Sequence, residues 1–150
     1  MKQLFILGLG ALILAACNKD KFETKPQLKI ESLSSDFVPR NQDLQITFSF
    51  TDKEGDVDDT LYLVRTRLNQ RGPYTDINPF DYKIPNFPDQ QSGEITLNMS
   101  YGFALTAGIS SIGIPGTTDR EPDTMALKFV LLDKGKNVSD TAIANVIVER

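Results

Sequence analysis

The sequence contains no histidine and no tryptophan, and it has a single cysteine among its 150 residues. Without histidine there is no Ser-His-Asp triad, no histidine general base and no histidine-ligated zinc or haem. A single cysteine excludes an internal disulfide. Basic residues are outnumbered, with 16 Lys and Arg against 20 Asp and Glu, so the net charge is −4. We therefore expect a single domain that does not bind nucleic acid and does not work as an enzyme.

The first sixteen residues have the pattern of an export signal. Lys2 supplies a positive charge, the run from Leu4 to Leu14 is apolar and broken only by two glycines, and Ala15 and Ala16 are small residues before a cleavage point. A membrane-spanning helix needs about 20 consecutive apolar residues, and this run is shorter. The pattern predicts that residues 1–16 are a signal peptide that is removed.

The motif Leu14-Ala15-Ala16-Cys17 resembles the bacterial lipobox, in which the cysteine receives a diacylglyceryl group before cleavage. The resemblance implies that Cys17 becomes an acylated N-terminus and that the protein is bound to a membrane, because two or more acyl chains give stable anchoring. The alternative is an ordinary secretory signal that leaves a free thiol on Cys17. Residues 17–26 are mostly polar and predict a short lipidated tether, which leaves residues 27–150 for the folded domain.

The polar stretch that follows Cys17, residues 18–23, is similar to the segment after the acylated cysteine in lipoproteins of the Bacteroidota. Some of those lipoproteins are displayed on the outer face of the outer membrane. The resemblance implies a place in the outer membrane of a bacterial envelope, on either its periplasmic or its surface face. A lysine-rich linker without a targeting role is the alternative.

Beyond the tether, apolar and polar residues alternate with a period of two, which is typical of half-buried β-strands. The pattern is strongest in residues 43–51, and it recurs in residues 60–68, 93–101, 124–133 and 140–149, with a weaker example in residues 27–33. After the signal segment, no window keeps a helical period over three turns. The sequence therefore predicts an all-β, immunoglobulin-like β-sandwich of about six or seven antiparallel strands.

Two segments are similar to small Ig-like lipoproteins of the Bacteroidota. Residues 48–57, FSFTDKEGDV, resemble the pattern FxFxDxxGD, and residues 133–139, DKGKNVS, resemble the hairpin D-x-x-G-N-x-S at the end of those domains and of cadherin-like modules. Here Lys136 separates the glycine from the asparagine. The resemblance implies the sandwich fold. It implies no particular function, because such modules serve adhesion, substrate capture and scaffolding alike.

The loop after the strand at residues 43–51 is dense in carboxylates. Calcium takes six to eight oxygens from the carboxylates and carbonyls of a tightly curved loop. Asp133 emerges at the same edge if the strands at residues 43–51 and 124–133 run in the same direction. The candidate calcium ligands are Asp52, Glu54, Asp56, Asp58 and Asp133. The alternative is a solvated turn whose carboxylates serve the backbone conformation. No other cofactor is expected.

Residues 72–88 contain four prolines and four aromatic residues, Tyr74, Phe80, Tyr82 and Phe87. We expect an irregular connection, and connections of this length are often functional. Aromatic faces near Asp and Asn side chains stack on sugar rings or hold a peptide. The alternative is that the aromatic residues cap the open end of the sandwich. A second connection, residues 102–123, is either a mobile interaction loop or contains an unrecognised strand.

Together these features predict a membrane-anchored, non-enzymatic binding or scaffolding module of the bacterial envelope. Its partners are the membrane, through the N-terminal lipid, and an envelope protein or glycan. Two alternatives remain open. One is a carbohydrate-binding accessory lipoprotein of a glycan uptake system, and the other is a small hydrolase that relies on Asp and Glu.

Overall fold

The structure is a computed structural model that describes residues 23–72 and 76–150. The segment expected to be a signal peptide, Cys17 and Tyr74 lie outside the described residues. The long strands are β1 (Gln27–Leu33), β3 (Leu44–Thr51), β4 (Thr60–Arg67), β5 (Asp76–Lys83), β6 (Ser92–Met99), β9 (Asp123–Leu132) and β10 (Ala142–Val148). The short elements are β2 (Phe37–Val38), the π-helix η1 (Tyr101–Leu105), β7 (Ile112–Gly113) and β8 (Arg120–Glu121).

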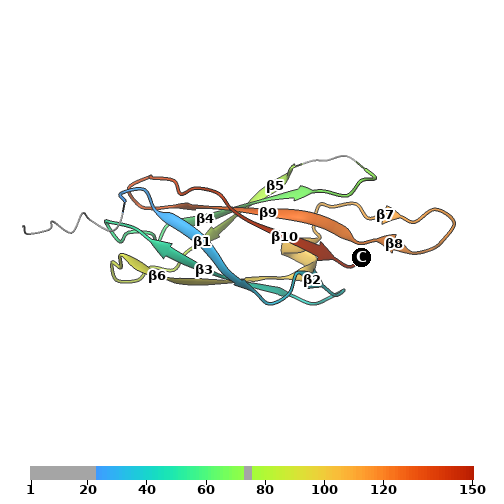
Figure 1. The fold of residues 1–150 in the computed structure, drawn as a ribbon, viewed down its shortest axis with the longest axis horizontal. Coiled ribbons are helices and arrows are strands. Elements are labelled where there is room, and N and C mark those ends of the chain that lie inside the picture. Colours follow the sequence, from blue (N-terminus) through green and yellow to red (C-terminus); the bar gives the residue numbers. More distant parts are fainter. Residues whose placement is uncertain (1–22, 73–75) are drawn as a thin grey trace, which may run out of the picture.

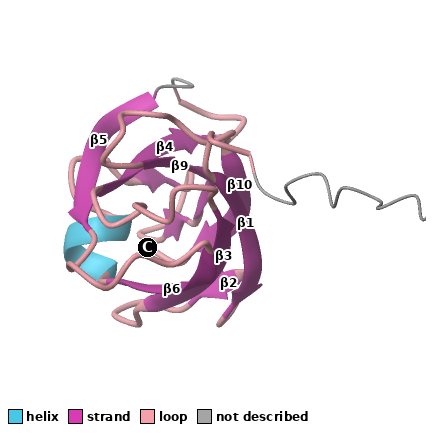
Figure 2. Ribbon diagram, turned by 90° about the vertical axis from the view of Figure 1, so that its left-hand side faces the viewer, coloured by secondary structure: helices cyan, strands magenta, loops and turns pink. Residues whose placement is uncertain are grey.

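The long strands form two sheets that face each other (Figure 1). The smaller sheet has the order β1-β3-β6, and the larger has the order β2-β10-β9-β4-β5. Neighbouring strands are antiparallel except β2 and β10, which are parallel. Figure 2 shows the two layers end-on, with η1 on the side where β5 and β6 lie. The chain is an all-β, immunoglobulin-like β-sandwich, as the alternation in the sequence predicts.

The core lies between the two sheets. The side chains that the alternation of β3 places on one face, Leu44, Ile46, Phe48 and Phe50, are all buried. Across the core, the ring of Phe48 meets the ring of Phe129 from β9 edge to face, with 4.8 Å between the centroids. Alternate residues of β9 and β10 are buried in the same way. The period of two therefore predicted the inward face of these strands correctly.

The prediction of an irregular connection at residues 72–88 was wrong, because residues 76–83 form β5. A register shift between Leu63 and Arg65 of β4 places Phe80 and Ile77 of β5 opposite them, so the inward residues of β5 are three apart. This irregularity breaks the period of two by which strands are recognised. Pro79 is tolerated because β5 is the last strand of its sheet and has one free edge.

The second connection, residues 102–123, also contains regular structure. It begins within η1, directly after β6, and continues into the hairpin of β7 and β8. The amide of Thr106 donates a hydrogen bond to the carbonyl of Tyr101, five residues earlier, which is the i to i−5 spacing of a π-helix. Within the described residues, no helix has the length and apolar character needed to cross a membrane.

The molecule has two unlike ends, set by the directions of the strands. Thr51 pairs with Gln27 and Ser92, and Thr60 pairs with Lys83 and Leu132. One end therefore carries residues 23–26 and the loops 52–59, 84–91 and 133–141, and we call it the tether end. The opposite end carries the loops 34–43 and 106–122, the hairpin of β7 and β8, and Arg150, and we call it the far end (Figure 1).

Contacts with the domain begin at Glu23, within the segment expected to be tether. The carbonyl of Glu23 accepts a hydrogen bond from the amide of Lys53. Lys25 lies 2.5 Å from a carboxylate oxygen of Asp140, and Pro26 is buried. Residues 23–26 are therefore packed on the tether end.

Candidate functional site

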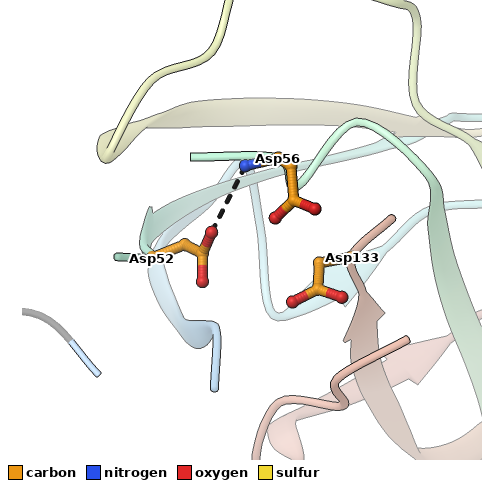
Figure 3. Close-up of side chains that lie close together, drawn as sticks. All are labelled: Asp52, Asp56 and Asp133. Carbon is orange, nitrogen blue, oxygen red and sulfur yellow. Dashed lines mark hydrogen bonds between the residues drawn. The ribbon is translucent and has the colours of Figure 1, made fainter. Parts of the chain in front are cut away.

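Three of the five proposed calcium ligands meet at the tether end. One carboxylate oxygen from each of Asp52, Asp56 and Asp133 lies within 4.8 Å of the other two. Figure 3 shows the three carboxylates gathered around one point, two from the loop after β3 and one from the loop after β9. Asp52 and Asp133 are completely buried, and Asp56 is partly buried. The predicted meeting of Asp133 with the acidic loop is therefore seen in the structure.

Local hydrogen bonds fix two of these carboxylates. Oδ2 of Asp52 accepts hydrogen bonds from the amides of Gly55 at 2.7 Å and Asp56 at 3.3 Å, which closes the loop into a turn. Asp133 accepts from Asn137 with both oxygens, from the backbone amide at 2.7 Å and from the side-chain amide at 2.9 Å. The carboxylates of Asp52 and Asp133 therefore shape their loops, as the alternative interpretation requires.

The two loops are also joined to each other. The amide of Lys134 donates to the carbonyl of Asp56 at 3.0 Å. Gly55 has a φ of +77° and lies against the backbone of Gln90, in the loop 84–91. The cluster is therefore held by contacts among three loops of the tether end.

Some oxygens of the cluster have no hydrogen-bond donor. Among the described residues, Oδ1 of Asp52 and Oδ1 of Asp56 are buried without a partner. No ion pair joins a described Lys or Arg to Asp52, Asp56 or Asp133. Burial raises the pKa of Asp56, and the neighbouring carboxylates of Asp133 and Asp52 raise it further. Turn formation accounts for the role of Oδ2 of Asp52. It does not account for the burial of Oδ1 of Asp52 or of Oδ1 of Asp56.

The other two proposed ligands lie outside this cluster. The side chain of Asp58 is paired with Lys134, whose Nζ lies 2.7 Å from Oδ1, and it also accepts from the amide of Phe87. The hydrogen bond from Lys134 lowers the pKa of Asp58. Glu54 is exposed. The spacing of the carboxylates in the sequence did not distinguish these two residues from the three that meet.

Asp59 is a further carboxylate at the tether end with basic partners. It lies 2.6 Å from Nζ of Lys136 and 3.2 Å from Nζ of Lys83. The hydrogen bonds from Lys136, Thr60 and Lys83 hold its pKa well below the ordinary value of an aspartate. The lysines of the loop 133–137 are therefore bound to Asp58 and Asp59, next to the cluster.

The aromatic residues proposed as a ligand platform cover the open side of the core. Phe80, Tyr82 and Phe87 are partly buried against it. The ring of Phe80 stacks on Tyr82 with 6.3 Å between centroids. Phe103 of η1, which was not among the proposed residues, is 68% exposed and meets Phe80 edge to face at 5.3 Å. The exposed ring in this group is thus Phe103, and Tyr74 lies outside the described residues.

Two arginines on the inner face of β4 have a role that no pattern in the sequence indicates. Arg65 and Arg67 are buried, in phase with Leu61 and Leu63. The guanidinium of Arg65 lies 4.5 Å from the centre of the Phe80 ring, and burial lowers its pKa. The alternation of β4 predicts that both side chains point inward. Their partners come from distant segments and have no signal in the sequence.

These arginines hold the segment after η1 by its backbone. Arg65 donates to the carbonyls of Leu105 and Ala107, and Arg67 donates to the carbonyl of Ser110. Arg150 donates to the carbonyl of Ile109. Asp123, which is completely buried, lies 2.7 Å from Arg67 and 3.2 Å from Arg150. We call Arg65, Arg67, Asp123 and Arg150 the arginine clamp.

The far end also carries a polar hollow. Its volume is about 410 Å³, and its lining combines Phe37 with three arginines and two carboxylates, Arg40, Arg120, Arg150, Asp119 and Glu149. The side chains of Arg40 and Arg120 are exposed, and Phe37 is 45% exposed. Two guanidinium groups and an aromatic ring therefore face solvent around one hollow, at the end of the molecule away from residues 23–26.

Comparisons with known proteins show resemblance at the level of shape. No family model and no curated protein matches the chain. Spo0M, a sporulation control protein of Bacillus subtilis, aligns with a TM-score of 0.49 and 13% identity. The alignment covers 84% of this chain and 50% of the Spo0M chain. A Niemann-Pick type C2 protein from the Japanese carpenter ant aligns with a TM-score of 0.46 and 10% identity, over 85% of this chain and 98% of that chain.

A β-glucosidase from Kluyveromyces marxianus aligns over 85% of this chain and 14% of its own, with a TM-score of 0.43 and 10% identity. The chain thus resembles a small part of that enzyme. Function therefore has to be inferred from the residues themselves.

Proposed function

We propose that the protein is a non-enzymatic module of the bacterial envelope, anchored in the outer membrane by lipid on Cys17, that holds or presents a partner. The observation that supports this proposal is the difference between its two ends. The described chain begins at the tether end, on which residues 23–26 are packed. The far end carries a hollow with two exposed guanidinium groups and a partly exposed aromatic ring.

In this proposal, the length of the tether keeps one end of the domain near the bilayer. A stretch of chain spans at most about 3.3 to 3.6 Å per residue, so the six residues from Cys17 to Phe22 reach about 20 Å. With a lipid on Cys17, the tether end stays close to the headgroups. The far end then points into the surrounding compartment, where a partner can reach it.

The far end has the chemistry of a protein-binding surface. Arginine and aromatic residues are enriched where proteins bind one another, and they contribute a large share of the binding energy. The guanidinium groups of Arg40 and Arg120 match carboxylates, with which arginine forms paired hydrogen bonds. We therefore propose as partner an envelope protein that presents acidic side chains to this hollow.

Cell fractionation tests the anchor. In the native host, the wild-type protein is expected in the membrane fraction, and mass spectrometry is expected to find acyl chains on Cys17. Cys17→Ser is expected to move the protein to the soluble fraction or to leave the signal peptide uncleaved. A wild-type protein with a free thiol that diffuses freely would contradict the proposal.

Crosslinking in intact cells tests the partner surface. The wild-type protein is expected to crosslink to one envelope protein, and the double change Arg40→Ala and Arg120→Ala is expected to reduce that product at least about tenfold, since a buried charged contact is worth 2 kcal/mol or more. Lys29→Ala, an exposed change on β1, serves as the control and is expected to keep the product. Equal crosslinking by all three proteins places the contact elsewhere and contradicts the proposed surface.

Carbohydrate binding is the second candidate function, and the exposed ring of Phe103 favours it. Phe103 is 68% exposed beside Phe80, and an open aromatic face suits the apolar side of a sugar ring. A glycan array is expected to show a hit that Phe103→Ala abolishes and that Phe37→Ala retains, because Phe37 is an exposed aromatic ring at the far end. An array without a hit excludes this candidate.

A further inference from the structure

The cluster of Asp52, Asp56 and Asp133 contains more negative charge than its loops require. Oδ2 of Asp52 and both oxygens of Asp133 are used to close turns. Oδ1 of Asp52, in a side chain with no exposed surface, has no donor among the described residues, and neither does Oδ1 of Asp56. A buried carboxylate oxygen without a partner costs free energy, and native structures usually provide it with a donor or a cation.

The lysines of the loop 133–137 have carboxylate partners outside the cluster. Lys134 is paired with Asp58 at 2.7 Å, and Lys136 is paired with Asp59 at 2.6 Å. Both lysines come from the same loop as Asp133, yet neither forms an ion pair with the cluster in the described part of the chain. Within the described residues, the three carboxylates therefore face one another without an ion pair to any Lys or Arg, which favours a bound cation.

The separation of the oxygens suits one ion. Oxygens that share a calcium ion lie about 2.4 Å from it, so two of them are at most about 4.8 Å apart. One oxygen of each carboxylate lies within 4.8 Å of the others, so no pair of them is too far apart to share one calcium ion. Magnesium binds oxygen at about 2.0 to 2.1 Å and prefers to keep several waters. It therefore suits a site with shorter oxygen–oxygen distances and fewer protein ligands.

We propose that Asp52, Asp56 and Asp133 bind one calcium ion at the tether end. Three carboxylates leave a net charge of −1 on the occupied site, and bidentate contacts and water supply the remaining oxygens of the six to eight that calcium takes. The ion joins the loop that crosses from β3 to β4 with the loop after β9. It therefore links the two sheets at the end where residues 23–26 are packed.

Thermal unfolding of the full-length protein in detergent tests this site. Extracellular calcium modules bind with Kd of about 0.1 to 1 mM, so the wild-type protein is compared in EDTA and in about 10 mM calcium. A ligand that binds the folded state alone raises the Tm by mass action, and we expect a rise of about 3 to 10 °C. Isothermal titration with calcium is expected to give one site per chain.

Asp56→Asn is the decisive variant, because no amide of the described residues closes a turn onto its carboxylate oxygen Oδ1, while its charge belongs to the cluster. In EDTA it is expected to melt at or above the wild-type temperature, since one of three repelling charges is gone. In calcium its Tm is expected to rise by less than a quarter of the wild-type rise. Glu54→Gln removes an exposed carboxylate from the same loop and is expected to respond like the wild type.

Three results overturn the proposal. One is a wild-type Tm that does not change in calcium, and another is an equal rise in Asp56→Asn and the wild type. The third is an equal rise with magnesium at the same concentration, which contradicts the assignment to calcium. Potassium chloride at matched ionic strength is expected to give no rise, which separates binding from screening. None of these outcomes depends on the lipid or on a partner, so failure here leaves the proposed envelope function standing.

Discussion

At the scale of single residues, Gly55 shows how closely the loops of the tether end are packed. Its φ is +77°, and a Cβ built on it would lie 2.9 Å from both the carbonyl carbon and the amide nitrogen of Gln90. A side chain at this position would be strained by the positive φ and would also clash with the backbone of Gln90. The loop that carries Asp52 and Asp56 therefore depends on a glycine between them.

We expect Gly55→Ala to lower the free energy of unfolding by roughly 2 to 4 kcal/mol, because the positive φ and the clash with Gln90 add. Chemical denaturation measures the loss. Gly116 has a φ of +78°, and no atom lies within 4 Å of a Cβ built on it. Gly116→Ala therefore introduces backbone strain without a steric clash, and it is expected to lower the free energy of unfolding by about 1 to 2 kcal/mol. An equal cost in the two variants would show that the contact with Gln90 gives way easily.

The carboxylate of Asp59 gives a prediction for the dependence of stability on pH. Its pKa in the folded protein is lowered by Lys136, Thr60 and Lys83. A lowered pKa means that the ionised group stabilises the fold above the unfolded value of about 3.9, and that this contribution is lost as the pH falls through the folded pKa. We expect Asp59→Asn to melt below the wild type at pH 7.

Melting curves of both proteins across the pH range are the measurement. The difference in Tm between wild type and Asp59→Asn is expected to be constant from pH 7 to about 5, to shrink below about 3.9 and to vanish in stronger acid. A difference that stays unchanged in acid would show that Asp59 acts through its shape and not through its charge.

At the scale of structural elements, the arginine clamp holds the segment after η1 against the core. Arg67 donates to Asp123 and to the carbonyl of Ser110. Removal of Arg67 leaves Asp123, which is completely buried, with Arg150 alone. Breaking a buried ion pair by removing one partner is far more damaging than losing a surface pair.

We expect Arg67→Met to lower the free energy of unfolding by about 3 to 5 kcal/mol and to speed hydrogen exchange at the amides of residues 104–109. Denaturation with exchange mass spectrometry measures both effects. Arg71→Met is the matched control, because Arg71 pairs with Glu121 on the surface, and it is expected to cost less than about 1 kcal/mol. Equal costs would mean that Asp123 finds a new partner.

Among these elements, the strands with one buried face were predictable from the sequence. The alternation in β3, β9 and β10 reports burial directly, since the side chains of a strand point to opposite faces in turn. The strand β5 was missed because a bulge changes the spacing of its inward residues and prolines suggested a loop. Such an irregularity is set by pairing with β4, which is a tertiary property.

The candidate site was also predictable in part from the sequence. The direction of β3 and β9 correctly brought Asp133 to the acidic loop. The sequence did not predict which acidic residues join the cluster and which pair with lysines. That outcome depends on which carboxylates the lysines of the loop 133–137 contact in the folded protein. Lys134 pairs with Asp58 and so separates it from the cluster.

At the scale of the whole molecule, the length of the strands separates the two ends. The longest strand, β9, has ten residues and rises about 3.3 Å per residue, so it spans roughly 30 Å. A protein anchored at the tether end should therefore hold its far end well above the headgroups. The single native cysteine, Cys17, is consumed by the lipid in the proposed state, so one introduced cysteine can be labelled selectively.

We expect a fluorophore on Glu54→Cys to be quenched by nitroxide lipids more strongly than one on Thr118→Cys, when the lipidated protein is reconstituted in vesicles. Both positions are exposed, at the tether end and the far end respectively. Fluorescence quenching against the proportion of nitroxide lipid is the measurement. Equal quenching at the two positions would indicate a domain that lies flat on the bilayer or tumbles freely on its tether.

The proline of β5 has a consequence for proteins crowded on a surface. β5 is the outermost strand of the larger sheet, and Pro79 lies at its irregular pairing with β4. Proline offers no amide hydrogen, and a bulged border is a poor template for another strand. If lipid on Cys17 confines copies of this chain to a membrane, as we propose, they meet one another often, and this edge lets them collide and separate without joining into a continuous β-sheet.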